Sequence, residues 1–338
     1  MSKLKIGFFT PYYKSNRGNA TTTRRIIHGL NRAGVETYVV PYLEESWSEE
    51  KDAKLAECQL YHMVHLFRFT RWNMCRELPL TKPYILTSGG TDINHDIANA
   101  DQVKEMAYLV DNASFITVFT EDAKQKLAEA YPSKVSEINI IPQSVWFEDS
   151  SDQRLLNIPK GKPTIFLPAG IRKVKDPLYV WKEIKTLKDK YKDLQFIIAG
   201  VVIEKDLFKE ILSLCQKYDW VHFFENVPFG QMEQLYRQAD ITINTSISEG
   251  QSSALIEAMY CGSPLIVRKN EGNLSVVTHG KTGFVFEKQA EFHSLAIALL
   301  ENSIQRKEII ANAHSYVLKH HSLETEISRY VSLYKQLV

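Results

Sequence analysis

Short apolar runs alternate with longer amphipathic stretches along most of this chain. The apolar runs are rich in Ile, Val and Phe, as buried parallel strands are. The amphipathic stretches repeat apolar residues every three to four positions, which predicts helices. The strands expected on this basis are 5–9, 35–40, 59–66, 83–87, 115–119, 138–142, 164–168, 195–200, 221–225 and 240–246. The helices expected between them include 22–34, 120–131, 176–191, 204–218, 230–239 and 254–262.

The alternation predicts an α/β protein built from two consecutive Rossmann-like halves. It lapses once, over 143–163, where Ser, Asp, Pro and Gly accumulate as they do in linkers. We therefore expect an N-terminal domain over 1–150 and a C-terminal domain over 160–320, with a cleft between them. A chain of 338 residues is long enough for each half to bury its own core.

Composition narrows the class of protein. Lys+Arg 41 against Asp+Glu 40 argues against a nucleic-acid binder driven by overall charge. The four cysteines lack disulfide or metal spacing, and neither a signal-peptide pattern nor a transmembrane run is evident, so we expect a cytoplasmic protein. The segment 65–76 interleaves arginines with aromatic residues. A solvated edge explains it best, and an acceptor surface or a peripheral membrane contact stays open.

The stretch 246–267 carries the clearest candidate chemistry. It runs from a strand end through the polar loop SISEGQSS into the helix ALIEAMYCG. Ligands sit beyond the carboxyl ends of parallel strands, a helix N-terminus favours phosphate, and Gly250 allows close backbone approach. Glu249 and Glu257 would flank that phosphate and accept hydrogen bonds from hydroxyl groups, which describes a nucleotide sugar.

Two other interpretations of the glutamates compete with this one. The ordinary interpretation is that both glutamates are solvated charges at the end of a helix. The helix is strongly apolar around Glu257, however, so a charge there needs a partner. A glycosidase pair would need both carboxyl groups at one glycosidic bond, and the phosphate-binding context disfavours it.

These residues resemble a known family. SEGQSSALIEAMYCGSPLIV, followed by NEGNLSVVTHGKTGFVF, is similar to the donor-site signature of family 4 (group 1) glycosyltransferases with the GT-B fold. RGNATTTRR, SGGTDIN, VFTE and AGIRKVKDPLYV further resemble the glycosyltransferase 1 domain-containing protein 1 group. The resemblance implies two Rossmann-like domains, with a C-terminal helix near 322–338 packing back on the first.

The resemblance also implies roles for residues of the C-terminal half. Glu249 would contact the transferred sugar, Arg172 and Lys175 would neutralise the diphosphate, and Lys173 is a rival for the lysine position. The remaining donor-binding residues implied are Gly250, Gln251 and Ser252 at the diphosphate, Glu257 at the ribose, and Asn226 and Val227 at the base. The chain departs from the family pattern at Ser275, where a glutamate is usual.

The N-terminal half offers candidates for the acceptor or sugar side. Gly18 and Asn19 precede the first helix, and Gly90, Thr91 and Asp92 follow a predicted strand. A turn-capping role is the ordinary alternative for Asp92. The histidine that many family members carry in this region is not evident, and His95 lies too far along.

The expected function is a retaining, metal-independent transfer of a sugar from a nucleoside diphosphate sugar, with UDP-sugars favoured, to an unidentified acceptor. No cofactor and no metal ligand set are expected. The alternatives are a selenosugar synthase-like transfer to an inorganic acceptor, a nucleotide-sugar epimerase, and a non-catalytic nucleotide-sugar-binding subunit of a paired transferase.

Overall fold

A computed structural model describes residues 3–15, 17–148 and 156–338, and divides the chain into two compact units. Unit 1 comprises Met1–Gln143 and Ser322–Val338, and unit 2 comprises Ser144–His321. Each unit holds one six-stranded sheet in which every strand pair is parallel. The predicted α/β fold class is confirmed. The central part of the expected linker, 149–155, lies outside the described residues.

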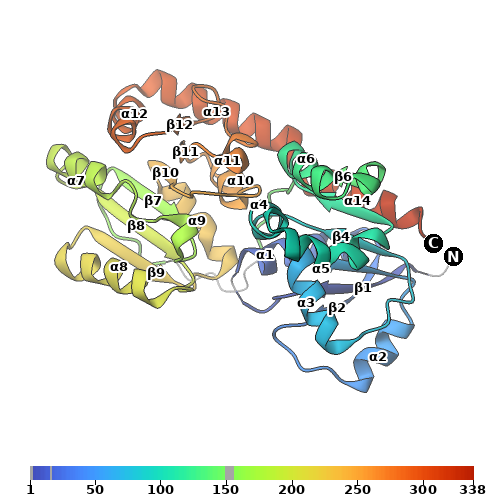
Figure 1. The fold of residues 1–338 in the computed structure, drawn as a ribbon. Helices are drawn as coiled ribbons and strands as arrows, with labels where there is room; N and C mark the ends of the chain where they lie inside the picture. The colour runs from blue at the N-terminus through green and yellow to red at the C-terminus, as the bar shows by residue number, and fades with distance from the viewer. Residues whose placement is uncertain (1–2, 16, 149–155) are drawn as a thin grey trace. The chain divides into compact units, whose positions relative to one another are not determined.

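Unit 1 is built around a sheet with the order β2-β1-β3-β4-β5-β6 (Figure 1). Helices α1 and α14 pack their apolar residues on one face, and α2, α3, α5 and α6 cover the other. Its strands are β1 (Lys5–Thr10), β2 (Glu36–Pro41), β3 (Leu60–Val64), β4 (Tyr84–Thr87), β5 (Phe115–Val118) and β6 (Ile138–Ile140). Its helices are α1 (Gly18–Arg32), α2 (Glu49–Ala56), α3 (Leu66–Arg76), α4 (Thr91–Asn94), α5 (Ala100–Asp111), α6 (Glu121–Ala130) and α14 (Leu323–Lys335).

The ends of the unit 1 helices follow the local chemistry that the sequence predicts. Gly34 adopts a φ of 84° just beyond α1, a left-handed conformation that glycine reaches without a Cβ penalty. Thr120 caps α6 by accepting a hydrogen bond from the backbone N–H of Ala123. The C-terminal helix α14 is tied to α1 by a buried ion pair between Arg25 and Glu326.

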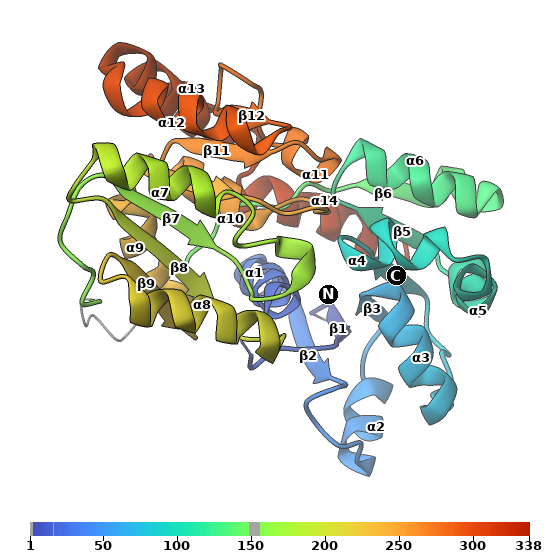
Figure 2. The same cartoon turned by 60° about the vertical axis from the view of Figure 1, so that its left-hand side comes forward.

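Unit 2 repeats the design with the order β12-β11-β10-β7-β8-β9 (Figure 2). Its strands are β7 (Thr164–Pro168), β8 (Gln195–Gly200), β9 (Val221–Glu225), β10 (Ile241–Asn244), β11 (Leu265–Arg268) and β12 (Phe284–Phe286). Its α-helices are α7 (Trp181–Lys190), α8 (Lys205–Lys217), α9 (Met232–Gln238), α10 (Ser253–Tyr260), α11 (Glu271–Leu274), α12 (Gln289–Glu301) and α13 (Ser303–His320). The order reverses at β7, which lies between β8 and β10. Such a switch point is where ligands bind in open parallel sheets.

Candidate functional site

The candidate site lies at the switch point of unit 2, where a lysine and a glutamate meet. Strands β7 and β10 pair in parallel, with Ile241 opposite Ile165, so their carboxyl ends reach the same edge. The loop after β7 contains a short 3₁₀ turn, Lys173–Lys175, and the loop after β10 contains Glu249. Lys175 Nζ lies 2.6 Å from Glu249 Oε1. Two loops that are distant in sequence therefore form one ion pair.

The carboxylate of Glu249 is nearly enclosed and held by further donors. Its side chain is 9% exposed, and Oε1 also accepts hydrogen bonds from Ser246 Oγ at 2.7 Å and Asn244 Nδ2 at 3.1 Å. Burial acts to raise the pKa of Glu249, but the Lys175 ammonium and these donors outweigh it and lower the pKa. Glu249 is therefore ionised at neutral pH and acts as an acceptor of hydrogen bonds.

Helix α11 packs against the loop that carries Glu249. A Cβ on Gly272 would lie 2.4 Å from the carbonyl oxygen of Glu249, so only glycine fits at this approach. Asn273 is fully buried and donates to Asn244 Oδ1 at 3.2 Å. Ser275, noted above as a departure from the family pattern, donates its Oγ hydrogen to the carbonyl of Gly272 at 2.7 Å. The segment after β11 thus positions the Glu249 loop, which the sequence analysis did not predict.

The loop that carries Lys175 is fixed by a second ion pair. Asp176 follows Lys175 and adopts a φ of 42°. Its Oδ2 lies 2.9 Å from Nη1 of Arg268, and the Arg268 guanidinium stacks 3.8 Å from the ring centre of Tyr179. Neither Asp176 nor Arg268 was among the predicted site residues. Arg268 is the last residue of β11, and β11 lies two strands from β7 in the sheet. The position of the loop after β7 therefore depends on the strand order.

The other basic residues of the loop lie differently. Arg172 immediately precedes the 3₁₀ turn and is half-buried. Lys173, the rival for the lysine position, is exposed, and its backbone N–H donates to Glu204. Of the two lysines, the one that the structure brings to Glu249 is Lys175.

Glu257 has the partner that its apolar helix requires. It lies in α10, is 6% exposed, and accepts a hydrogen bond from the hydroxyl of Tyr236 in α9 at 2.8 Å. Tyr236 is fully buried, and burial together with the neighbouring carboxylate raises the pKa of Tyr236 well above its usual value. Tyr236 therefore stays a hydrogen-bond donor to Glu257.

The start of α10 has the features of an anion-binding terminus. Ser252 precedes the helix, and its side chain makes no cap hydrogen bond. Ser252 Oγ instead lies 3.4 Å from Asn244 Nδ2. Gly250 and Gln251 lie directly between Glu249 and this helix start. The first-turn N–H groups of α10 thus lack the usual side-chain cap.

Asn226 and Val227 lie on the same edge of the sheet, beyond the carboxyl end of β9. Asn226 is exposed and adopts a φ of 54°, whereas Val227 is buried. Because β9 is separated from β7 by β8, these residues occupy the outer part of the edge. Their role at a nucleotide base stays a prediction.

The candidates of unit 1 divide into two groups. Gly18 and Asn19 open α1, whereas Gly90 and Thr91 open the short helix α4, with a φ of 65° at Gly90. Asp92 is fully buried.

The contacts of Asp92 are those of a residue that positions loops. Its carboxylate accepts hydrogen bonds from the backbone N–H of Leu66, the hydroxyl of Ser88 and the backbone N–H of Gly89. These contacts join the loops that follow β3 and β4. They favour the turn-capping role, and a sugar contact for Asp92 stays a prediction.

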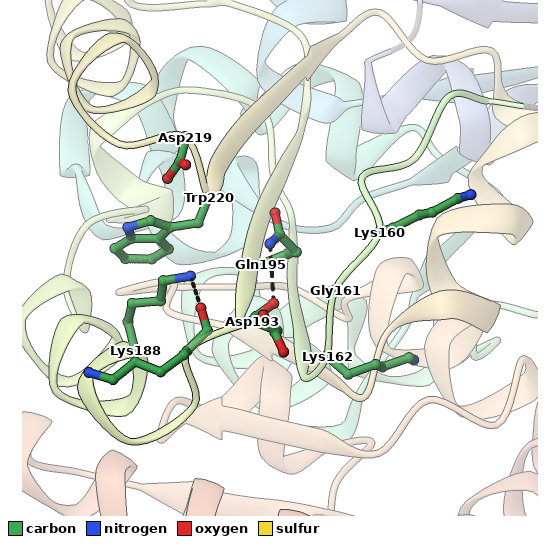
Figure 3. Close-up of a pocket in the computed structure, with 9 residues that line it drawn as sticks. Lys160, Gly161, Lys162, Lys188, Asp193, Gln195, Asp219 and Trp220 are labelled. Atoms are coloured by element: carbon green, nitrogen blue, oxygen red, sulfur yellow. Dashed lines mark hydrogen bonds between the residues drawn. The ribbon is translucent and has the colours of Figure 1, made fainter.

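A separate hollow of about 470 Å³ lies at the opposite edge of the unit 2 sheet. Its lining comes from the segments that precede β7, β8 and β9 (Figure 3). Lys188 already donates to the carbonyls of Lys192 and Leu194, and Lys162 pairs with Asp240. Because it lies at the amino ends of the strands, away from the switch point, we do not assign chemistry to it.

Two further observations concern metals and membranes. Within residues 3–15, 17–148 and 156–338, no group of three or more His, Cys, Asp or Glu side chains is placed to hold a metal ion. In the same described ranges, no helix combines the length and apolar character needed to cross a bilayer.

Two units, each built on a parallel α/β sheet, are the fold class of GT-B glycosyltransferases. Residues 149–316, nearly all of unit 2, match the family described as glycosyl transferases group 1, and this half of the chain belongs to that family. It is similar to glycosyltransferase 1 domain-containing protein 1 of Xenopus tropicalis, with 28% identity over 98% of this chain and 97% of that protein. It is also 25% identical to a D-inositol 3-phosphate glycosyltransferase of Corynebacterium jeikeium, over 53% of this chain and 46% of that enzyme.

Solved structures confirm the fold. Anabaena HepE in complex with UDP and glucose superposes with a TM-score of 0.77 and 16% identity, covering 99% of this chain and all of that one. Sucrose-phosphate synthase from Thermosynechococcus elongatus gives a TM-score of 0.74 and 17% identity, covering 99% of each chain.

Proposed function

We propose that the protein transfers a sugar from a nucleoside diphosphate sugar to an acceptor hydroxyl with retention of the anomeric configuration. The observation that carries the proposal is the enclosed Lys175–Glu249 pair beside the uncapped start of α10. A UDP-sugar is the favoured donor, which agrees with the UDP and glucose bound by HepE. The near full-length relative in Xenopus tropicalis, a glycosyltransferase by name, supports the reaction class.

The barrier to transfer arises as the anomeric C–O bond breaks and negative charge gathers on the departing diphosphate. Arg172, Lys175 and the first-turn amides of α10 would stabilise that charge, and such preorganised groups contribute about 3–4 kcal/mol each. The phosphate oxygen that departs accepts the proton of the acceptor hydroxyl. The acceptor oxygen forms its new bond on the face from which the phosphate leaves. Because cationic side chains neutralise the diphosphate, the transfer requires neither a metal nor a cofactor.

The carboxylates would hold the two sugars of the donor. Glu249, kept ionised by Lys175, accepts hydrogen bonds from hydroxyls of the transferred sugar. Glu257, held by Tyr236, accepts from the ribose. Gly250, Gln251 and Ser252 contribute backbone amides to the diphosphate, and Asn226 and Val227 lie beside the base.

The test is acceptor-free incubation with UDP-, GDP- and ADP-sugars in the presence of a metal chelator. Slow release of free sugar, first formed with the donor's anomeric configuration by NMR, is expected for a retaining transferase. A new sugar isomer would identify an epimerase, and binding without turnover would identify a non-catalytic subunit.

Variants connect this activity to the site. Glu249→Gln and Lys175→Ala should reduce turnover at least about 100-fold, because the first removes a carboxylate that holds the transferred sugar and the second removes a charge that stabilises the departing diphosphate. Lys173→Ala is the matched control, since Lys173 is exposed in the same turn, and it should keep activity within about twofold. Full turnover by Glu249→Gln with an unchanged circular dichroism spectrum would refute the assignment.

A further inference from the structure

The turn that carries Lys175 is held in a backbone conformation that its own sequence disfavours. Asp176 adopts a φ of 42° and a ψ of 55°, in the left-handed region that residues other than glycine seldom occupy. The next residue is Pro177, and a proline favours an extended conformation in the residue before it. A backbone held away from its local preference is kept there by contacts with other segments, and such positions cluster at functional sites.

Arg268, at the end of β11, supplies these contacts. Its Nη1 lies 2.9 Å from Asp176 Oδ2 and donates to the carbonyl of Thr245 at 3.4 Å. Thr245 in turn donates its hydroxyl hydrogen to the carbonyl of Lys175 at 3.0 Å. One guanidinium therefore joins the loop after β7 to the loop after β10, the two loops that meet in the Lys175–Glu249 ion pair.

The guanidinium of Arg268 is itself fixed by stacking. It lies 3.8 Å from the ring centre of Tyr179, and that ring stacks on Phe286 of β12 with 6.2 Å between the ring centres. A planar guanidinium can stack on an aromatic face while its N–H groups bond in its own plane, which a lysine ammonium cannot do. The position of Arg268 is thus set by strands β11 and β12, and the turn at Asp176 is held to it.

The backbone on either side of Lys175 is tied to the loop after β10. The N–H of Ile247 donates to the carbonyl of Val174 at 2.9 Å, one residue before Lys175. With both neighbours of Lys175 held, its side chain reaches Glu249 at 2.6 Å. A shift of about 1 Å in a group that acts on the reacting atoms can cost about 100-fold in rate, so the hold on this turn matters for chemistry.

We propose that Arg268 is a positioning residue for Lys175. It acts through the turn at Asp176 and through Thr245. The inference rests on the proposed function, in which Lys175 stabilises the negative charge that gathers on the departing diphosphate. Because that charge grows as the transition state is reached, loss of Arg268 should lower the rate of transfer more than the affinity for the donor.

The first test is kinetic and uses donor hydrolysis by the full chain. Arg268→Gln removes the guanidinium and keeps a polar side chain. It should lower kcat about tenfold or more and change KM less than about threefold. Arg306→Gln is the matched control, because Arg306 Nη2 lies 3.1 Å from Asp240 Oδ1 in a pair of similar burial that precedes β10, at the amino end of the strand. It should keep kcat within about twofold.

A double-mutant cycle shows whether Arg268 acts through Lys175. Added to Lys175→Ala, the change Arg268→Gln should lower kcat by less than about twofold more, because the group that it positions is already gone. Full multiplication of the two separate losses, or wild-type kcat in Arg268→Gln, would overturn the inference.

A second readout needs no turnover. Labelling with acetic anhydride, followed by mass spectrometry, compares Lys175, whose side chain is 17% exposed, with the surface residue Lys209, at 76%. Arg268→Gln should raise the labelling of Lys175 relative to Lys209 about threefold or more as the turn loosens, and Arg306→Gln should leave it unchanged. Unchanged labelling of Lys175 in Arg268→Gln would refute its positioning by Arg268. Failure of the wild-type protein to hydrolyse any nucleotide sugar would instead count against the proposed function.

Discussion

The ion pair between Arg25 and Glu326 should dominate the docking of the C-terminal helix α14 on unit 1. Two hydrogen bonds join the side chains, Nε to Oε2 at 2.9 Å and Nη2 to Oε1 at 3.0 Å. The two side chains are 2% and 1% exposed. Gln143 accepts a further bond from Arg25 Nη2 at 3.1 Å. Such a pair is costly to break because the remaining charge stays in a site without water.

The magnitude follows from the charge that is left behind. Glu326→Gln leaves a buried guanidinium without its counter-charge, so the loss should reach about 3–5 kcal/mol. Arg25→Met leaves a buried carboxylate without its cation, and we expect a loss in the same range.

The assay is urea unfolding followed by hydrogen exchange in peptides from α1 and α14, which reports on unit 1 alone. Glu57→Gln is the matched control, because Glu57 pairs with Lys5 at the surface with side chains 54% and 37% exposed. That change should leave the urea midpoint almost unchanged, because exposed ion pairs contribute little to stability. If Glu326→Gln cost no more than Glu57→Gln, the reasoning from burial would be wrong.

Three further changes probe other parts of the chain. Gly272→Ala should lower kcat about 100-fold with an unchanged fold, because its methyl group would displace Glu249; wild-type turnover would contradict this. Tyr236→Phe should raise KM for the nucleotide sugar about tenfold with little change in kcat, because Glu257 loses a donor; a fall in kcat alone would argue against a ground-state binding role. Burial lowers the pKa of His62 to about 3, so this imidazole stays neutral in the folded protein at pH values where it is protonated in the unfolded chain. As pH falls below about 6.5, unit 1 should therefore lose up to about 1.4 kcal/mol of stability per pH unit. His62→Asn should flatten that dependence in urea midpoints at pH 7 and pH 5, and an equal slope in both proteins would exclude His62 as its source.

Much of the fold could be predicted because buried parallel strands leave a strong pattern. Each of the ten expected strands overlaps an observed one, from β1 to β10. Helix α3 was not predicted, because its arginines alternate with its aromatic residues and made the segment read as a surface patch. In the structure the helix buries Leu66, Phe69 and Thr70, and Tyr42 and Trp72 pack around Phe69.

The candidate site was predictable in its residue types and less so in its contacts. Glu249 and Lys175 follow strand ends, and that position is visible in the pattern. The contacts of Gly272 with the Glu249 loop and of Asp176 with Arg268 join segments that are far apart in sequence. They form only once β10 and β11 are placed beside β7, which no local pattern specifies.

The strand order determines whether the predicted site residues come together in space. A chain that alternates strands and helices fits many orders, and the simplest would place β10 beyond β9. Neighbouring strands lie about 4.8 Å apart, so β10 would then stand three spacings, about 14 Å, from β7. The loops after β7 and β10 would then no longer start from adjacent strands, as they do around the 2.6 Å contact of Lys175 with Glu249. The return of the chain to the inner edge of β7 therefore places these two loops side by side, and the same reversal at β1 brings Arg17 and Arg68 to one tyrosine ring in unit 1.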